Sequence, residues 1–67
     1  MIQLYVNGKS REVEKDTTVA QLLEDLGTRS ERVAVELNLR ILDKRDHAQT
    51  ILKAGDRLEI ISFVGGG

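Results

Sequence analysis

Residues 2–27 read IQLYVNGKSREVEKDTTVAQLLEDLG, and this stretch decides the fold. The segment IQLYV alternates apolar and polar residues, which predicts a strand with one face turned inward. Asn7 and Gly8 follow, and both residue types accept the positive φ of a two-residue hairpin turn, so KSREVE is predicted to return as a second strand. A strict two-residue turn sets Lys9 and Arg11 on the inward face. We therefore expect these two side chains to emerge at the sheet margin, or the register to shift through a bulge.

The second half of the stretch, DTTVAQLLEDLG, predicts a helix. Thr18 and Gln21 have the spacing of a capping box, and Gly27 suits the left-handed position that ends a helix. The apolar residues recur at i, i+3, i+4 and i+7 and form one stripe, made of Val19, Leu22, Leu23 and Leu26. In so short a helix, such a stripe is typical of a core face rather than of a groove for another helix.

Two further strands are predicted after the polar link TRSER. The first is VAVEL, with Val33, Val35 and Leu37 inward, and it is followed by a turn at Asn38 and a short extended piece. The second is RLEIISFV, with Leu58 and Ile60 on one face and Ile61 and Phe63 on the other. The segment between them, DKRDHAQTILKAGD, is irregular; we expect one helical turn, Ile51 and Leu52 pointing inward, and a tight turn at Gly55-Asp56.

The predicted order is hairpin, helix, strand, short connection and strand. A helix that follows a hairpin must pack across one face of the sheet, and a right-handed crossover then sets the first strand beside the last one, in parallel. We therefore predict an α+β fold of the ubiquitin-like β-grasp class, with a mixed sheet of four to five strands and one main helix. Residues 1–64 would form the domain, and residues 65–67 a flexible glycine tail.

Composition narrows the classes of function. The 67 residues include no cysteine and no proline, and ten basic and eleven acidic residues give a net charge of −1. Disulfides and thiolate metal sites are therefore excluded, and such a mixed surface argues against binding to nucleic acid. No apolar run approaches membrane-spanning length and no basic, apolar leader precedes the first strand, so we expect a soluble, cytoplasmic protein without a membrane partner.

Catalytic residues are not indicated. His47 is the only histidine and lies in the charged stretch RDHAQ, so we expect a solvated surface residue rather than a general base. Ser10, Ser30 and Ser62 lack a nucleophile motif and have no histidine near them in sequence. The acidic residues are scattered without metal-ligand spacing. We therefore predict no enzyme activity, no metal and no cofactor of its own.

The glycine run Gly65-Gly66-Gly67 allows two interpretations. It could be a loose end without function, or a segment that threads into a partner. Glycine has no side chain to clash with a narrow channel and adopts extended conformations freely. A carboxylate at Gly67 could attack the α-phosphate of ATP to give an acyl-adenylate, provided that a partner enzyme supplies a closed nucleotide site.

The whole chain resembles the ThiS family of thiamine-biosynthesis sulfur carriers. The matching pieces are YVNG at 5–8, TTVAQLLEDLG at 17–27, VAVELN at 33–38 and ILKAGDRLEIISFVGGG at 51–67. The helix alone is a weak signature, whereas the Gly-Asp turn, the strand and the glycine pair together are specific. The resemblance implies that Gly67 is the modified residue and that Gly65 and Gly66 thread into the partner.

The resemblance also implies the partners. An E1-like adenylyltransferase of the ThiF type would use ATP to adenylate Gly67, and a donor such as a cysteine desulfurase would supply the sulfur. A thiazole synthase of the ThiG type would then take this sulfur from the thiocarboxylate. The predicted docking residues are Tyr5, Ile61, Phe63 and Val64. The alternative is that the connection after Asn38 covers the apolar residues among them.

Three other functions are weighed against this one. The small subunit of molybdopterin synthase shares the fold and the thiocarboxylate, but it typically carries prolines before its final glycines, and this chain has none. A ubiquitin-like modifier would be conjugated to lysines through Gly67. A plain binding module would have no use for the glycines.

Overall fold

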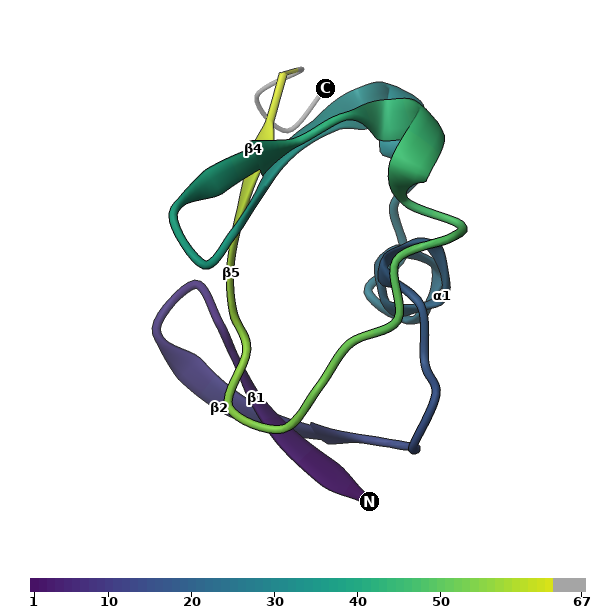
Figure 1. Cartoon of the computed structure of the whole chain (residues 1–67). Coiled ribbons are helices and arrows are strands. Elements are labelled where there is room, and N and C mark those ends of the chain that lie inside the picture. The colour runs from purple at the N-terminus through teal and green to yellow at the C-terminus, as the bar shows by residue number, and fades with distance from the viewer. Residues whose placement is uncertain (64–67) are drawn as a thin grey trace.

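The computed structural model describes residues 1–63 of the chain. Five strands and one α-helix, joined by two short 3-10 helices, make up this part of the protein (Figure 1). In chain order the elements are β1 (Ile2–Val6), β2 (Lys9–Val13), α1 (Val19–Asp25), η1 (Ser30–Arg32), β3 (Val33–Leu37), β4 (Arg40–Leu42), η2 (Lys44–Asp46) and β5 (Arg57–Ser62). The strands form one mixed sheet in the order β2-β1-β5-β3-β4, so the last strand lies in the centre.

The first hairpin has the predicted two-residue turn. Asn7 and Gly8 both have positive φ, at 51° and 83°. Val6 faces Lys9 in the register of β1 and β2, so the ladder contains no bulge. Lys9 and Arg11 are exposed because β2 is one of the two edge strands of the sheet, which confirms the first of the two expectations for these residues.

The helix begins with the predicted capping box. The Thr18 hydroxyl accepts a hydrogen bond from the Gln21 backbone N–H at 3.2 Å, and the Gln21 side chain accepts one from the Thr18 N–H at 2.9 Å. Gly27 has a φ of 82°, as expected for the residue that ends the helix. The expected apolar stripe is only partly buried, because Leu26 lies at the C-cap and is 37% exposed.

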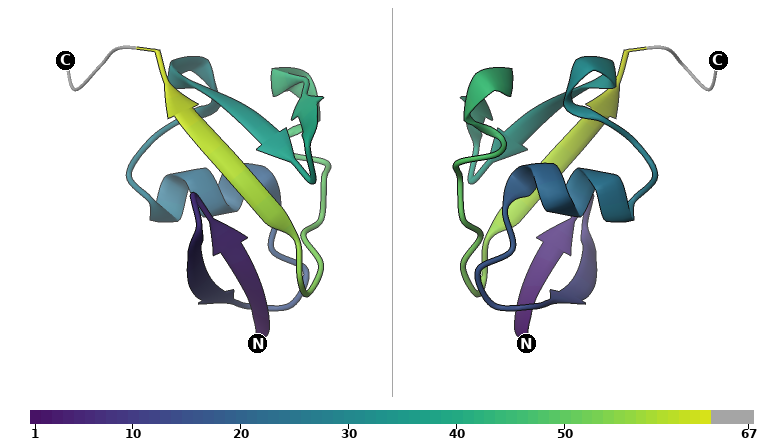
Figure 2. Two further views of the ribbon diagram at one scale, coloured as in Figure 1. Left: turned by 90° about the vertical axis from the view of Figure 1, so that its left-hand side faces the viewer. Right: turned by 90° about the vertical axis from the view of Figure 1, so that its right-hand side faces the viewer.

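The sheet curves around the helix and encloses the core between them. β5 runs parallel to β1 and antiparallel to β3, and α1 covers one face (Figures 1 and 2). The buried apolar side chains come from every layer: Leu4, Val13, Val19, Leu22, Leu23, Val33, Val35, Leu52 and Leu58. Each such side chain contributes roughly 1.5–3 kcal/mol of transfer free energy, which is the main stabilising term in a chain without disulfides. This is the ubiquitin-like β-grasp arrangement that was predicted.

The connection between β4 and β5 departs from the prediction at Ile51. Leu52 is buried as expected, but the Ile51 side chain is 51% exposed. Ile51 forms a β-bridge with Thr18, and the Leu52 N–H donates to the Thr17 carbonyl at 2.8 Å, so the chain is extended here. Successive side chains of an extended chain point to opposite sides, and only one of the two can face the core.

In residues 1–63, no helix is long and apolar enough to cross a membrane.

Candidate functional site

The glycine segment predicted to be the site lies outside the described residues. This holds for Gly65, Gly66 and Gly67, and also for the predicted docking residue Val64. The candidate site is therefore the end of β5 and the face of the sheet around it, here called the outer face. The outer face is the side of the sheet opposite α1 (Figure 2).

Two exposed apolar side chains lie at the end of β5, one within the strand and one just after it. Ile61 is 54% exposed and Phe63 is 66% exposed. Ile61 pairs with Ala34 on β3, and the Phe63 N–H donates to the carbonyl of Arg32, the last residue of η1, at 3.0 Å, so β3 and η1 hold the backbone of these two residues. Within residues 1–63 the connection after Asn38 does not cover them, which decides between the two expectations in favour of an exposed patch.

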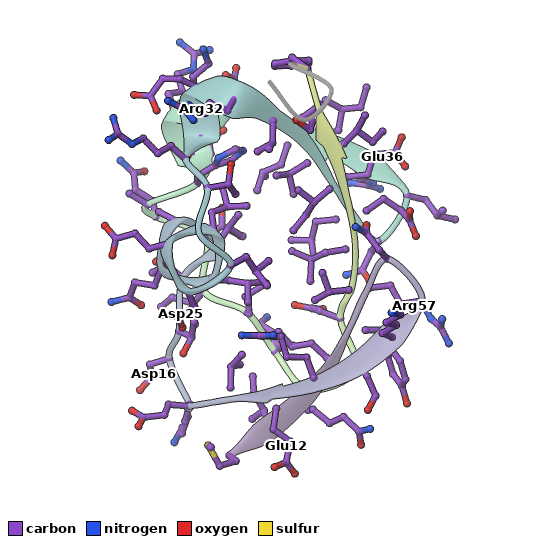
Figure 3. All side chains as sticks on the ribbon, turned by 180° about the vertical axis from the view of Figure 1, so that it is seen from behind. Glu12, Asp16, Asp25, Arg32, Glu36 and Arg57 are labelled. Carbon is purple, nitrogen blue, oxygen red and sulfur yellow. The ribbon has the colours of Figure 1, made fainter. Side chains whose placement is uncertain are left out.

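Tyr5 lies on the outer face but not beside this patch. It pairs with Arg57, the first residue of β5, whereas Ile61 and Phe63 lie at the other end of the strand. The Arg57 guanidinium stacks over the Tyr5 ring, 4.8 Å from its centroid (Arg57 is labelled in Figure 3). A rise of about 3.3 Å per residue separates Tyr5 from Ile61 by roughly 13 Å along the strand. The structure therefore does not bring the four predicted docking residues together in one cluster.

Two further exposed apolar residues, in the hairpin of β3 and β4, were not among the predicted docking residues. Ile41 on β4 is 81% exposed, and Leu39 in the turn before it is 92% exposed. Ile41 faces Glu36 across β3 and β4, and Glu36 in turn faces Glu59 across β3 and β5. Figure 3 shows Glu36 pointing away from α1. The available signal was the alternation of Ile41 with Leu42, which sends one side chain to each face.

The two glutamates give this part of the outer face a negative charge. Within residues 1–63 neither carboxylate forms an ion pair; the one ion pair there joins Arg45 and Asp43, at 3.2 Å. Like charges directly opposite one another in an antiparallel pair are destabilising. The outer face therefore combines exposed apolar side chains with unneutralised carboxylates.

His47 is not the solvated residue that the sequence predicted. Its side chain is 1% exposed, and Nδ1 lies 2.7 Å from the Ser30 hydroxyl. The backbone also draws it inward, since the Ala20 N–H donates to the His47 carbonyl at 3.0 Å and ties η2 to the start of α1. The second ring nitrogen, Nε2, is buried without a hydrogen-bond partner among the described residues.

The pairing of Ser30 with His47 brings together a hydroxyl and an imidazole, but its geometry does not favour catalysis. The imidazole is closed off from solvent, and no third group orients it through Nε2 in residues 1–63. A hollow of about 550 Å³ lies elsewhere, between the end of β2 and α1, and it is lined mainly by charged and polar side chains that include Glu14, Asp16 and Glu24. In the described part of the chain, no three potential ligands are grouped to hold a metal ion.

Comparison with known proteins gives a consistent result. The pattern of the ThiS family matches residues 4–67. The chain is 46% identical over 66 residues to a thiazole synthase of Paramagnetospirillum magneticum, where the match covers 98% of this chain but 20% of that protein. It is 38% identical to the sulfur carrier protein ThiS of Bacillus subtilis, with 96% and 98% of the two chains covered. The crystal structure of the thiamine biosynthesis protein ThiS from Geobacter metallireducens matches with a TM-score of 0.82 and 38% identity, over 98% of this chain and 100% of that one.

Proposed function

The chain belongs to the ThiS family, and from this premise we propose that it is a sulfur carrier in thiamine biosynthesis that works through the carboxylate of Gly67. In this proposal the protein is a substrate of its partner enzymes and does not catalyse the chemistry itself. The observation that carries it is the family match, which extends through residue 67 and so includes the glycines that follow β5.

The proposed chemistry has three steps. The Gly67 carboxylate attacks the α-phosphate of ATP in an E1-like, ThiF-type enzyme, which releases pyrophosphate and leaves an acyl-adenylate. A sulfide-level nucleophile, released by a thiol reductant from a sulfur donor such as a cysteine desulfurase, then attacks the carbonyl carbon. The bond from this carbon to the AMP oxygen breaks, AMP leaves and a thiocarboxylate remains. A ThiG-type thiazole synthase finally takes the sulfur. ATP is bound by the adenylating enzyme, and the carrier needs no cofactor of its own.

The described residues support this role through the outer face. Ile61 and Phe63 are exposed immediately before the glycine segment, so a partner that docks on them would have the segment within reach. Single exposed apolar residues are common on any surface, but Ile61 near the end of β5 and Phe63 just after it form a localised patch. A thiazole synthase is supported as one partner, because a 66-residue region similar to this chain is part of the thiazole synthase of Paramagnetospirillum magneticum.

Intact-mass analysis tests the proposal. The carrier is produced together with a ThiF-type enzyme and a sulfur donor, and its mass is compared with that of the carrier produced alone. We expect a shift equal to the exchange of one oxygen for one sulfur, located at Gly67 by fragmentation. Deletion of Gly67 is the matched control, and it should abolish the shift while the far-ultraviolet circular dichroism spectrum stays unchanged. No shift in the wild-type chain would refute the proposal, and higher-mass conjugates would point to a protein modifier instead.

A further inference from the structure

The side chain of Asn7 continues the sheet beyond the point where β1 ends. The Asn7 backbone N–H donates to the Leu58 carbonyl at 2.8 Å and belongs to the parallel ladder between β1 and β5. After Asn7 the chain turns back into β2. β1 therefore offers β5 no further peptide groups.

The Asn7 carboxamide takes the place of the missing peptide group. Its Oδ1 accepts a hydrogen bond from the Ile60 N–H at 2.7 Å, and its Nδ2 donates to the Ile60 carbonyl at 3.3 Å. A primary amide presents the same acceptor and donor as a peptide unit, so this side chain pairs with Ile60 as a continuing strand would. Residues 7 and 60 are 53 positions apart, so the contact ties the first turn of the fold to the end of its last strand.

Past Ile60, the described part of β5 is held from the β3 side. Ile61 pairs with Ala34 and Ser62 with Val33, and the Phe63 N–H donates to the Arg32 carbonyl. The Asn7 carboxamide is thus the last group of the first hairpin to hold β5 within residues 1–63. After Ile60, β5 therefore changes from a strand bonded on both sides to a strand bonded on the β3 side alone.

We propose that Asn7 is a positioning residue, which fixes the direction in which the chain leaves the sheet and so aims Gly67 at the adenylating site of the partner enzyme. The inference rests on the proposed function. Adenylation requires the carboxylate and the α-phosphate to approach in line, and a displacement of about 1 Å at a reacting group can cost roughly 100-fold in rate. A partner that grips Ile61 and Phe63 can place Gly67 only if the end of β5 that carries these two residues is itself fixed to the rest of the sheet, and the Asn7 contact with Ile60 fixes it on the β1 side.

The second hairpin supplies a matched control. Asn38 occupies the same turn position as Asn7, with a φ of 53° against 51°. Its side chain holds the opposite end of β5, because Oδ1 accepts from the Arg57 N–H at 3.0 Å and Nδ2 donates to Asp56 Oδ1 at 3.0 Å. Replacement of either asparagine by glycine keeps a residue that accepts positive φ and removes two hydrogen bonds. The two variants therefore differ in which end of β5 is released.

The experiment measures amide hydrogen exchange and adenylation in Asn7→Gly and Asn38→Gly, at a temperature where both are folded. In Asn7→Gly we expect the Ile60 amide to exchange faster while the Arg57 amide keeps its protection, and in Asn38→Gly the reverse. With a ThiF-type enzyme and ATP, kcat for Asn7→Gly should fall about tenfold. KM for the carrier should change less than about twofold, because β3 still holds Ile61 and Arg32 still holds Phe63. Asn38→Gly should keep the wild-type kcat.

Two outcomes overturn the inference separately. Equal kcat values for the two glycine variants, with the wild-type chain active, would show that Asn7 has no positioning role although the proposed function stands. A wild-type chain that is not adenylated would refute the proposed function and the role of Asn7 with it. Asn7→Asp is the second variant, should Asn7→Gly not fold. It keeps the acceptor for the Ile60 N–H, loses the donor, and should give a kcat between that of Asn7→Gly and the wild type.

Discussion

Replacement of Leu39 by glycine should stabilise the protein. Leu39 is the second residue of the turn between β3 and β4 and has a φ of 72°, while the equivalent residue of the first turn is Gly8, with a φ of 83°. A residue with a Cβ atom pays roughly 1–2 kcal/mol to enter the left-handed region, and glycine does not. The Leu39 side chain is 92% exposed, so little buried apolar area is lost on its removal.

The net gain is smaller than the strain, because glycine also makes the unfolded chain more flexible. That term is about 0.4–1 kcal/mol, so Leu39→Gly should raise the free energy of unfolding by about 0.5–1 kcal/mol. In a domain of this size, such a gain corresponds to a rise in Tm of roughly 2–8 °C. Urea and thermal unfolding, followed by circular dichroism at 222 nm, measure both quantities.

Leu39→Ala is the control that separates strain from the loss of the side chain. Alanine retains the Cβ atom, so this variant should show no gain in the free energy of unfolding. The converse change, Gly8→Ala, should cost about 1 kcal/mol through strain alone, since a Cβ at Gly8 would meet no other atom within 4 Å. A Leu39→Gly variant no more stable than Leu39→Ala would refute the reasoning that the turn is strained.

Three further predictions concern the buried histidine and the outer face. Ser30→Ala should lower the free energy of unfolding by roughly 1–2 kcal/mol in chemical denaturation, because it removes the hydrogen-bond partner of His47 Nδ1 and leaves a buried polar atom unsatisfied; a neutral result would contradict this. Ile61→Ser should weaken binding to the thiazole synthase about tenfold or more in calorimetric titration. Ile51→Ser, at a residue of the same type and similar exposure away from the patch, should bind as the wild type does, and equal losses in both variants would argue against a localised docking patch. Glu59→Lys replaces the like-charge pair of Glu36 on β3 and Glu59 on β5 with an attractive pair. At low salt, the free energy of unfolding should therefore rise by about 0.2–1 kcal/mol, and this gain should shrink as salt is added. An unchanged free energy of unfolding would mean that the two carboxylates do not interact.

The elements that the sequence predicted correctly are those set by local chemistry. Three of these elements satisfy a backbone requirement within four residues, and the structure has them where they were expected: the Asn7-Gly8 turn, the Thr18–Gln21 capping box and Gly27. The order of the strands follows from the same elements, because a hairpin followed by a helix leaves few ways to complete one sheet.

The errors fall where burial depends on distant residues. His47 lies in a charged stretch, yet it is buried because Ser30 and the first turn of α1 pack around it, 17 or more positions away. Ile51 and Leu52 are both aliphatic, and their different exposure depends on how Thr17 and Thr18 pair with the connection. The residue types alone do not show which of these two neighbours is buried. The sequence also left undecided whether Ile61 and Phe63 are exposed. The answer depends on the path of residues 43–56, which could have covered them.

The two turn asparagines show how this fold controls its last strand. Each begins a two-residue turn, so each would be explained by positive φ alone, yet both side chains bond to β5. One holds the start of the strand at Arg57 and the other holds it near its end at Ile60. Glycine would serve the turns equally well but could make neither contact, and this is why asparagine matters at both positions. A central strand fixed at two points behaves as a rigid support for whatever follows it. In the proposed role, this support fixes the point at which the chain leaves the sheet toward Gly67, and composition and periodicity alone do not reveal it.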